Sequence, residues 1–174
     1  MAKWQSGEVS RVAAADELPH RHSARVLLFD DAGRVCLLRC RDDLPIDPAM
    51  PGMVEYWSTP GGGLEPGETH EACALRELGE ELGILPGQVR LCGPVASWRK
   101  VLLCRGVLTL VVERWMVVRL APGTPDSLDL SGLTGDERRW IRGARWWTVE
   151  ETRSCSLPIM TPPVDELVRA AEVM

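Results

Sequence analysis

Three glutamates stand close together in the segment RELGEE, residues 76–81. Glu77, Glu80 and Glu81 are spaced so that they gather on one side of a helix. A solvated helix face explains such a cluster, because exposed like charges at this spacing cost only roughly a few tenths of a kcal/mol. Two features favour a functional role. The helix dipole disfavours negative charge at this end, and a glycine-rich loop, TPGGGLEPGE, precedes the helix.

Clustered carboxylates are suited to binding a hard divalent cation. Mg²⁺ prefers oxygen ligands in octahedral geometry and usually shares them with the phosphates of a substrate. Gly62 and Gly63 permit backbone conformations that are closed to other residues, so the loop can approach such a site closely. The sequence therefore indicates a cation site beside a phosphate-containing ligand.

The same segment resembles the Nudix signature, G-x5-E-x7-R-E-U-x-E-E-x-G-U, in which U is an aliphatic residue. It agrees at every fixed position: Gly62, Glu68, Arg76, Glu77, Leu78, Glu80, Glu81, Gly83 and Ile84. The flanking segments YWSTPGG and ARWWTVEE also resemble Nudix hydrolases, so the resemblance extends over residues 23–173. It implies an α/β/α sandwich with a mixed central β-sheet. It also implies hydrolysis of a phosphoanhydride bond in a nucleoside diphosphate linked to another group, X.

The resemblance further implies individual roles. The expected ligands of Mg²⁺ or Mn²⁺ are Glu77, Glu80, Glu81 and the carbonyl group of Gly61. Arg76 and Glu68 would form an ion pair that orients Glu77. Glu68 also suits a structural role, because an acid at the start of a helix is favoured by the dipole. The expected catalytic residues are Glu68, Arg76, Glu77 and Glu81.

The signature does not fix the general base, because the family places it either in the signature helix or on a later loop. Glu77 and Glu81 are the candidates in the helix. Glu113 interrupts the apolar segment LVVERWMVV, where it either faces solvent or turns toward the cluster. Glu137 follows a glycine-rich loop that could swing over the site, although an exposed loop acid is the simpler interpretation.

The group X is weakly specified. Trp57, just before the glycine loop, is the best candidate for stacking on a nucleobase, although core packing is the commoner role of tryptophan. The other expected substrate contacts are Gly62, Gly63, Glu113 and Glu137. The short chain favours a small nucleotide-type diphosphate, such as a nucleoside triphosphate or a nucleotide sugar.

Apolar runs and turn residues predict the elements that position these side chains. ARVLLF and RVCLLR flank a turn-forming cluster and predict a β-hairpin, and the Pro-rich residues 42–55 predict a loop. Thr69 suits the N-cap of a helix that ends before Gly83. Further strands are expected at residues 89–98 and 107–119 and in ARWWTVEE, and a terminal helix at 163–173.

The central helix is expected to carry opposite apolar and acidic faces. At about 100° per residue, one arc holds the apolar residues Ala72, Ala74, Leu75, Leu78, Gly79 and Leu82. The three glutamates lie on the other side. One face would dock on a core while the other presents the carboxylates.

The length, charge and composition of the chain limit the classes of protein to which it can belong. The 174 residues fit one domain, expected at 23–174 after an irregular or edge-strand lead-in at 1–22. The net charge of −5 argues against nucleic acid as a partner. The six cysteines lack zinc-ligand spacing, and the chain shows neither a signal-peptide core nor a membrane-spanning apolar run. We therefore expect a cytoplasmic protein without a membrane partner. The resemblance also allows a homodimer.

Two other functions compete with hydrolysis. A Nudix-fold nucleotide-binding or regulatory module that no longer cleaves would be free to lose its acids, so their presence argues against it. An isomerase acting on a prenyl diphosphate would need a catalytic cysteine and a modified signature, and the sequence identifies neither. A metal-dependent pyrophosphohydrolase is the function that the sequence favours.

Overall fold

The computed structural model describes residues 17–173, so residues 1–16 of the predicted lead-in lie outside the described part. The elements follow one another as β1 (His20–Phe29), β2 (Val35–Arg41), β3 (Glu55–Ser58), β4 (Gly61–Gly63), α2 (His70–Leu82), β5 (Val89–Cys104), β6 (Val107–Leu120), α3 (Glu137–Trp140), β7 (Ile141–Trp147), α4 (Val149–Arg153) and α5 (Val164–Ala171). No helix among residues 17–173 has the length and apolar character that a bilayer crossing requires.

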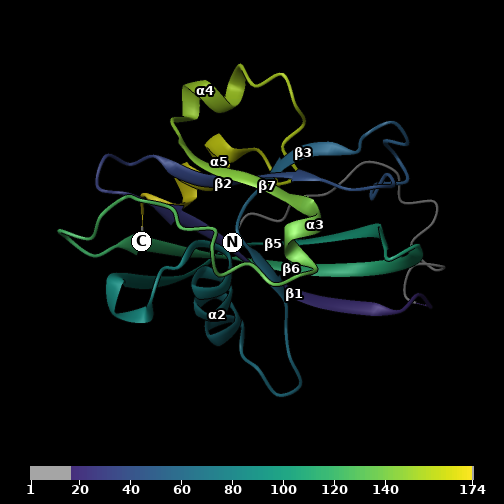
Figure 1. The fold of residues 1–174 in the computed structure, drawn as a ribbon, viewed down its shortest axis with the longest axis horizontal. Coiled ribbons are helices and arrows are strands. Elements are labelled where there is room, and N and C mark those ends of the chain that lie inside the picture. Colours follow the sequence, from purple (N-terminus) through teal and green to yellow (C-terminus); the bar gives the residue numbers. More distant parts are fainter. Residues whose placement is uncertain (1–16, 174) are drawn as a thin grey trace.

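A mixed sheet, seven-stranded within residues 17–173, forms the centre of the fold. Its strand order is β3-β2-β1-β6-β5, with β4 paired to β1 and β7 paired to β2. β1 and β6 run parallel, whereas the other pairs are antiparallel. Helix α2 lies below the sheet and α5 above it in Figure 1. This arrangement confirms the predicted α/β/α sandwich with a mixed sheet.

Alternating strand residues divide the interior into two apolar cores. In β1, Val26 and Leu28 pack in the core that includes Leu78 of α2. Leu27, between them in sequence, packs in the second core with Leu167 of α5. Because successive side chains of a strand point to opposite faces, the two helices are held on opposite sides of one sheet.

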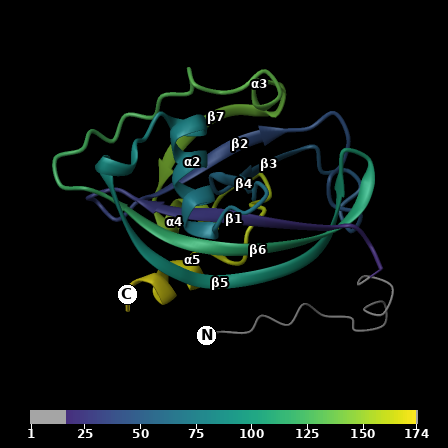
Figure 2. The same ribbon diagram turned by 90° about the horizontal axis from the view of Figure 1, so that it is seen from below.

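Two strand boundaries differ from the prediction. β1 begins at His20, so residues 20–22 of the predicted lead-in belong to it. β5 continues to Cys104, beyond the predicted end at residue 98, and forms a long curved hairpin with β6 (Figure 2). Charged residues interrupt the apolar pattern there, yet Lys100 still pairs with Val111 of β6. Backbone pairing, which the side-chain pattern does not report, extends this strand.

Both predicted ends of α2 are confirmed. The hydroxyl oxygen of Thr69 accepts a hydrogen bond from the Ala72 N–H at 3.2 Å, as an N-cap does. Gly83 has the left-handed φ of 67°, and its N–H donates to the Gly79 carbonyl at 3.1 Å. The Gly83 cap fixes the last turn of the helix, which carries Glu80 and Glu81, two of the three clustered glutamates.

The predicted separation of faces on α2 is wrong. Glu77 and Glu81 are buried, whereas Ala72 is exposed. The strip beneath the helix includes the glycine strand β4, whose Gly61 N–H donates to Glu81. A backbone N–H under the helix therefore holds Glu81 inward, while Arg76 holds Glu77, and a helical-wheel argument cannot anticipate either contact.

Candidate active site

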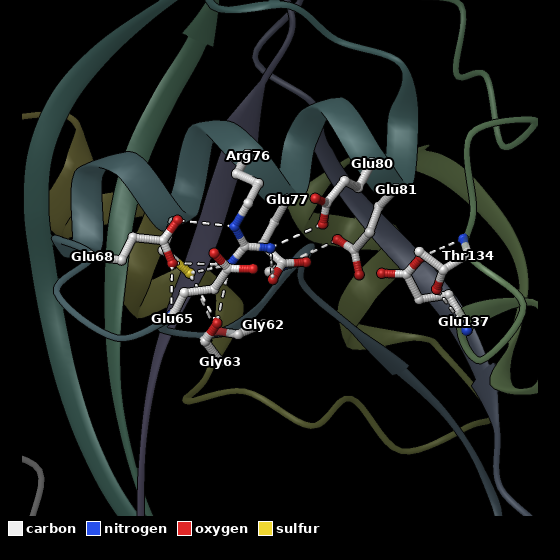
Figure 3. Close-up of polar contacts among 12 residues, drawn as sticks. Gly62, Gly63, Glu65, Glu68, Arg76, Glu77, Glu80, Glu81, Thr134 and Glu137 are labelled. Atoms are coloured by element: carbon white, nitrogen blue, oxygen red, sulfur yellow. Dashed lines mark hydrogen bonds and ion pairs between the residues drawn. The ribbon is translucent and has the colours of Figure 1, made fainter.

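Four carboxylates converge beside the last turns of α2 (Figure 3). Glu77, Glu80 and Glu137 each offer an oxygen atom, and these atoms lie within 4.8 Å of one another. Glu81 lies deeper and is 1% exposed. The three predicted glutamates of the helix thus lie together, and Glu137, which is 56 residues after Glu81 in the chain, joins them from the start of α3.

Arg76 ties the cluster to the start of the signature. Its guanidinium group makes two hydrogen bonds with the Glu68 carboxylate, at 2.9 and 3.0 Å. Its Nη1 atom donates to Glu77 and to Glu80, both at 2.9 Å. The expected Arg76–Glu68 ion pair is therefore present, and it fixes two carboxylates rather than one.

Glycine is required in the loop for space as well as for conformation. Gly61 has a φ of 127°, and a side chain there would also overlap the Ala24 carbonyl of β1. A side chain at Gly62 would overlap the Glu77 carboxylate, although Gly62 has an ordinary φ. Gly62 therefore allows close approach of the carboxylate to the loop, whereas Gly61 also supplies an unusual backbone conformation.

Burial and mutual repulsion set the protonation of the helix glutamates. Burial raises the pKa of Glu77, against the opposing charge of Arg76. Burial raises the pKa of Glu81 well above its usual value, and the charge of Glu77 adds to this effect. The hydrogen bonds from Arg76 lower the pKa of Glu68 to about 2. A positive partner would relieve the repulsion between the buried pair.

Glu137 is oriented by a local pair of hydrogen bonds. The N–H of Thr134 donates to Oε2 of Glu137 at 2.7 Å, and the N–H of Glu137 donates to the Thr134 hydroxyl at 3.3 Å. The spacing T-x-x-E in the segment TGDE is the sequence signal of such a reciprocal pair. The interpretation of Glu137 as an exposed loop acid is wrong, since it is half-buried beside the cluster.

Glu113 does not face solvent. It is 4% exposed and pairs with Arg25 of β1, with Nε and Oε1 2.6 Å apart. Arg25 in turn donates from Nη1 to the Gly61 carbonyl at 2.9 Å. The sequence analysis did not identify Arg25, although opposite charges that interrupt two apolar strands are a signal for such a pair.

Trp57 is not brought to the cluster. It belongs to the α5 side of the sheet, where its ring meets that of Trp147 edge-on with centroids 4.8 Å apart. Trp57 pairs with Arg39 of β2, so strand alternation directs it away from α2. Its neighbourhood favours packing over contact with a ligand at the carboxylates.

The cluster fits a hard divalent cation. The donors are carboxylate oxygens, the class of ligand that Mg²⁺ and Mn²⁺ prefer. Among residues 17–173, Glu81 has no ion-pair partner, so its buried carboxyl group lies beside three other acids without a compensating cation. Buried charges are costly unless they are paired or bind a metal. The carbonyl oxygen of Gly61, which already accepts from Arg25, has a second lone pair.

The family follows from the whole chain as well as from the site. Residues 19–170 match the sequence model of the NUDIX domain. The chain belongs to the Nudix family. The RNA pyrophosphohydrolase of Acidiphilium cryptum (strain JF-5) is 28% identical to it over 166 residues, which cover 91% of this chain and 93% of that protein. Another RNA pyrophosphohydrolase, from Dinoroseobacter shibae, is 28% identical over 137 residues, covering 73% and 79%.

Solved Nudix structures share the fold. The MutT protein from Methanosarcina mazei Go1 superposes with a TM-score of 0.60 at 16% identity, covering 90% of this chain and 96% of that one. A C. elegans Ap4A hydrolase in a binary complex gives 0.57 at 19% identity, covering 88% and 96%. At these identities the likeness concerns the fold alone. With the family and the pyrophosphohydrolase relatives, the predicted class of Nudix hydrolase is confirmed.

Proposed function

We propose that this Nudix protein is a metal-dependent hydrolase that cleaves a phosphoanhydride bond in a nucleoside diphosphate linked to a group X. The main support is that carboxylate oxygens of Glu77, Glu80 and Glu137 lie within 4.8 Å of one another, beside the buried Glu81. Four acids from two distant segments would repel one another without a cation. A module that only binds nucleotides has no need of such a cluster, so hydrolysis is the better-supported function.

The ion would be Mg²⁺ or Mn²⁺, held by Glu77, Glu80, Glu81 and Glu137, with the Gly61 carbonyl as a further candidate ligand. Such an ion neutralises phosphate oxygens and lowers the pKa of a bound water. Arg76 keeps Glu77 and Glu80 in place, and Glu68 keeps Arg76 in place. This prior ordering of the ligands is the contribution of the chain, since positioning dominates phosphoryl chemistry.

A carboxylate that takes a proton from the attacking water completes the reaction. Glu113 is engaged by Arg25 at 2.6 Å, so it is a poor candidate for this role. Glu77, Glu81 and Glu137 have oxygens at the cluster and are the remaining candidates. The pH–rate profiles of the single Gln variants would show which of these residues acts as the base and which bind only the metal.

The candidate substrates are nucleoside triphosphates, nucleotide sugars and RNA 5′ ends that carry a polyphosphate. The last class enters because relatives bear the name RNA pyrophosphohydrolase. The net charge of −5 argued against nucleic acid, but that argument concerns binding along a phosphate backbone, and an RNA end requires few contacts. A panel of these compounds with Mg²⁺, followed by release of phosphate or pyrophosphate, would assign the class.

We also propose a cytoplasmic location, supported by six cysteines that are all free thiols. A homodimer stays a prediction, which light scattering of the purified protein would test.

The decisive experiment compares acids on one helix. Glu77→Gln and Glu81→Gln should each lower kcat by about 100-fold or more, as loss of a charge that stabilises the transition state does. Glu71→Gln removes an exposed acid from the first turn of α2 and should leave kcat within about twofold of the wild type. Full activity of both cluster variants at saturating Mg²⁺ would exclude the proposed metal site.

A further inference from the structure

A part-buried ion pair joins two central strands behind the glycine loop. Arg25 of β1 and Glu113 of β6 lie 2.6 Å apart, with side chains 20% and 4% exposed. Such a pair is weak evidence for stability, because desolvating both charges offsets most of their attraction. Its position relative to the carboxylate cluster suggests a functional reason for its presence.

The pair reaches the cluster through Gly61. Nη1 of Arg25 donates to the Gly61 carbonyl at 2.9 Å, and the Gly61 N–H donates to Oε2 of Glu81 at 2.7 Å. One glycine therefore contacts both a half-buried guanidinium group and a buried acid of the cluster. The charge of Glu81 also acts on Arg25. Burial lowers the pKa of Arg25, but the charge and hydrogen bond of Glu113, together with smaller effects that include the charge of Glu81, raise it above the usual value.

Arg25 and a bound divalent cation would repel each other in this part of the site. A cation bound by Glu81 or by the Gly61 oxygen would stand close to the guanidinium group, and like charges in a buried site repel strongly. Glu113 offsets that repulsion, because it places a negative charge directly on Arg25. The net effect of the two residues on the cation depends on their balance.

We propose that Arg25 and Glu113 are positioning residues that set the affinity of the carboxylate site for its divalent cation. Arg25 fixes the Gly61 carbonyl and opposes the cation, while Glu113 anchors Arg25 and reduces this opposition. The inference rests on the proposed function, since it assumes that the cluster binds a metal. It adds two residues that lie outside the signature.

The proposal predicts effects of opposite sign for the two members of one ion pair. Arg25→Met removes the opposing charge. This effect outweighs the loss of one hydrogen bond to the Gly61 carbonyl, so the variant should bind Mn²⁺ about tenfold more tightly. Glu113→Gln leaves Arg25 unneutralised and should weaken Mn²⁺ binding by about the same factor. The double variant removes both charges and should bind Mn²⁺ with nearly the wild-type dissociation constant. A merely structural pair would shift both single variants in the same direction.

Mn²⁺ binding should be measured without substrate, from the electron paramagnetic resonance signal of the free ion. Lys100→Met is the matched control, because Lys100 is the partner of Asp47, an acid that is 1% exposed. Asp47 accepts its other hydrogen bond from the Ala49 N–H rather than from the glycine loop. This variant also leaves a buried acid without its cationic partner, and its dissociation constant for Mn²⁺ should equal that of the wild type.

The outcomes separate the two proposals. Absence of Mn²⁺ binding by the wild type would overturn the proposed function, and this inference with it. Wild-type binding with shifts of one sign, or with none, in both single variants would overturn this inference alone. If Arg25→Met does not fold, the double variant decides: tighter binding than in Glu113→Gln supports the role of Arg25, and equal binding refutes it.

Discussion

At the scale of single residues, the site is built from charges that the fold must tolerate. Glu81 is 1% exposed, and its hydrogen-bond donor is a backbone N–H rather than a cationic side chain. Burial and the neighbouring Glu77 raise its pKa well above the usual value. An ionised carboxylate in this position destabilises the folded state relative to the unfolded chain, where water solvates it. Stability therefore does not account for this residue, whereas the proposed metal site would.

Replacing Glu81 should consequently stabilise the protein in EDTA. Because the folded-state pKa of Glu81 lies above the unfolded one, the folded state binds more protons between the two values, and its stability falls as the pH rises through that window. Glu81→Gln should remove this loss, with a gain in unfolding free energy at pH 8 of about 1.4 kcal/mol per unit of raised pKa. Urea unfolding at several pH values measures it.

Glu150→Gln, at an exposed position on α4, is the control and should keep the wild-type pH dependence. Parallel stability curves for Glu81→Gln and the wild type would contradict the assignment of Glu81 as a destabilising buried charge.

At the scale of elements, the sequence indicates where a helix begins and ends, but not how a distant loop packs against it. The caps of α2 were predicted from Thr69 and Gly83, because both act on their own helix. The docking of the 121–136 loop on the end of α2 depends on distant contacts: the Asp129 N–H donates to the Leu82 carbonyl at 3.1 Å. The sequence therefore placed three of the four converging acids together. It named Glu137 as a candidate base or substrate contact without placing it in the cluster, and it predicted the faces of the helix wrongly.

This docking predicts a difference between two glycines of one loop. A Cβ atom at Gly132 would lie 3.1 Å from the Glu80 carbonyl at the end of α2, so the loop would have to move by a few tenths of an ångström. Gly132→Ala should shift Glu137 and weaken Mn²⁺ binding by about threefold to tenfold, consistent with the cost of mild overpacking. Calorimetric titration with Mn²⁺ gives the dissociation constants.

Gly135→Ala lies in the same loop with open space around its Cβ position, and it should bind Mn²⁺ like the wild type. Equal binding by the two alanine variants would mean that the docked loop does not position Glu137.

At the scale of the whole molecule, one sheet separates the site from a second core. The order β3-β2-β1-β6-β5 brings Arg25 and Glu113 together although they are 88 residues apart in the chain. The apolar pattern predicted the first hairpin and the later strands, because periodicity reports burial, whereas the sandwich was implied by the Nudix resemblance. The pattern could not report which face of the sheet meets which helix, since both faces are apolar. The sequence therefore left Trp57 open between stacking on a substrate and core packing, and its strand directs it toward α5.

Trp57→Leu distinguishes packing from substrate binding. The variant loses the edge-on contact with Trp147, and we expect it to lower the unfolding free energy by about 1–3 kcal/mol. KM for the substrate found in the panel should stay within about twofold of the wild type, because the side chain lies across the sheet from the carboxylates. Trp98→Leu, which loses a contact with Trp115 on the same face, should behave alike. A large rise in KM for Trp57→Leu alone, with unchanged stability, would show that Trp57 contacts the substrate.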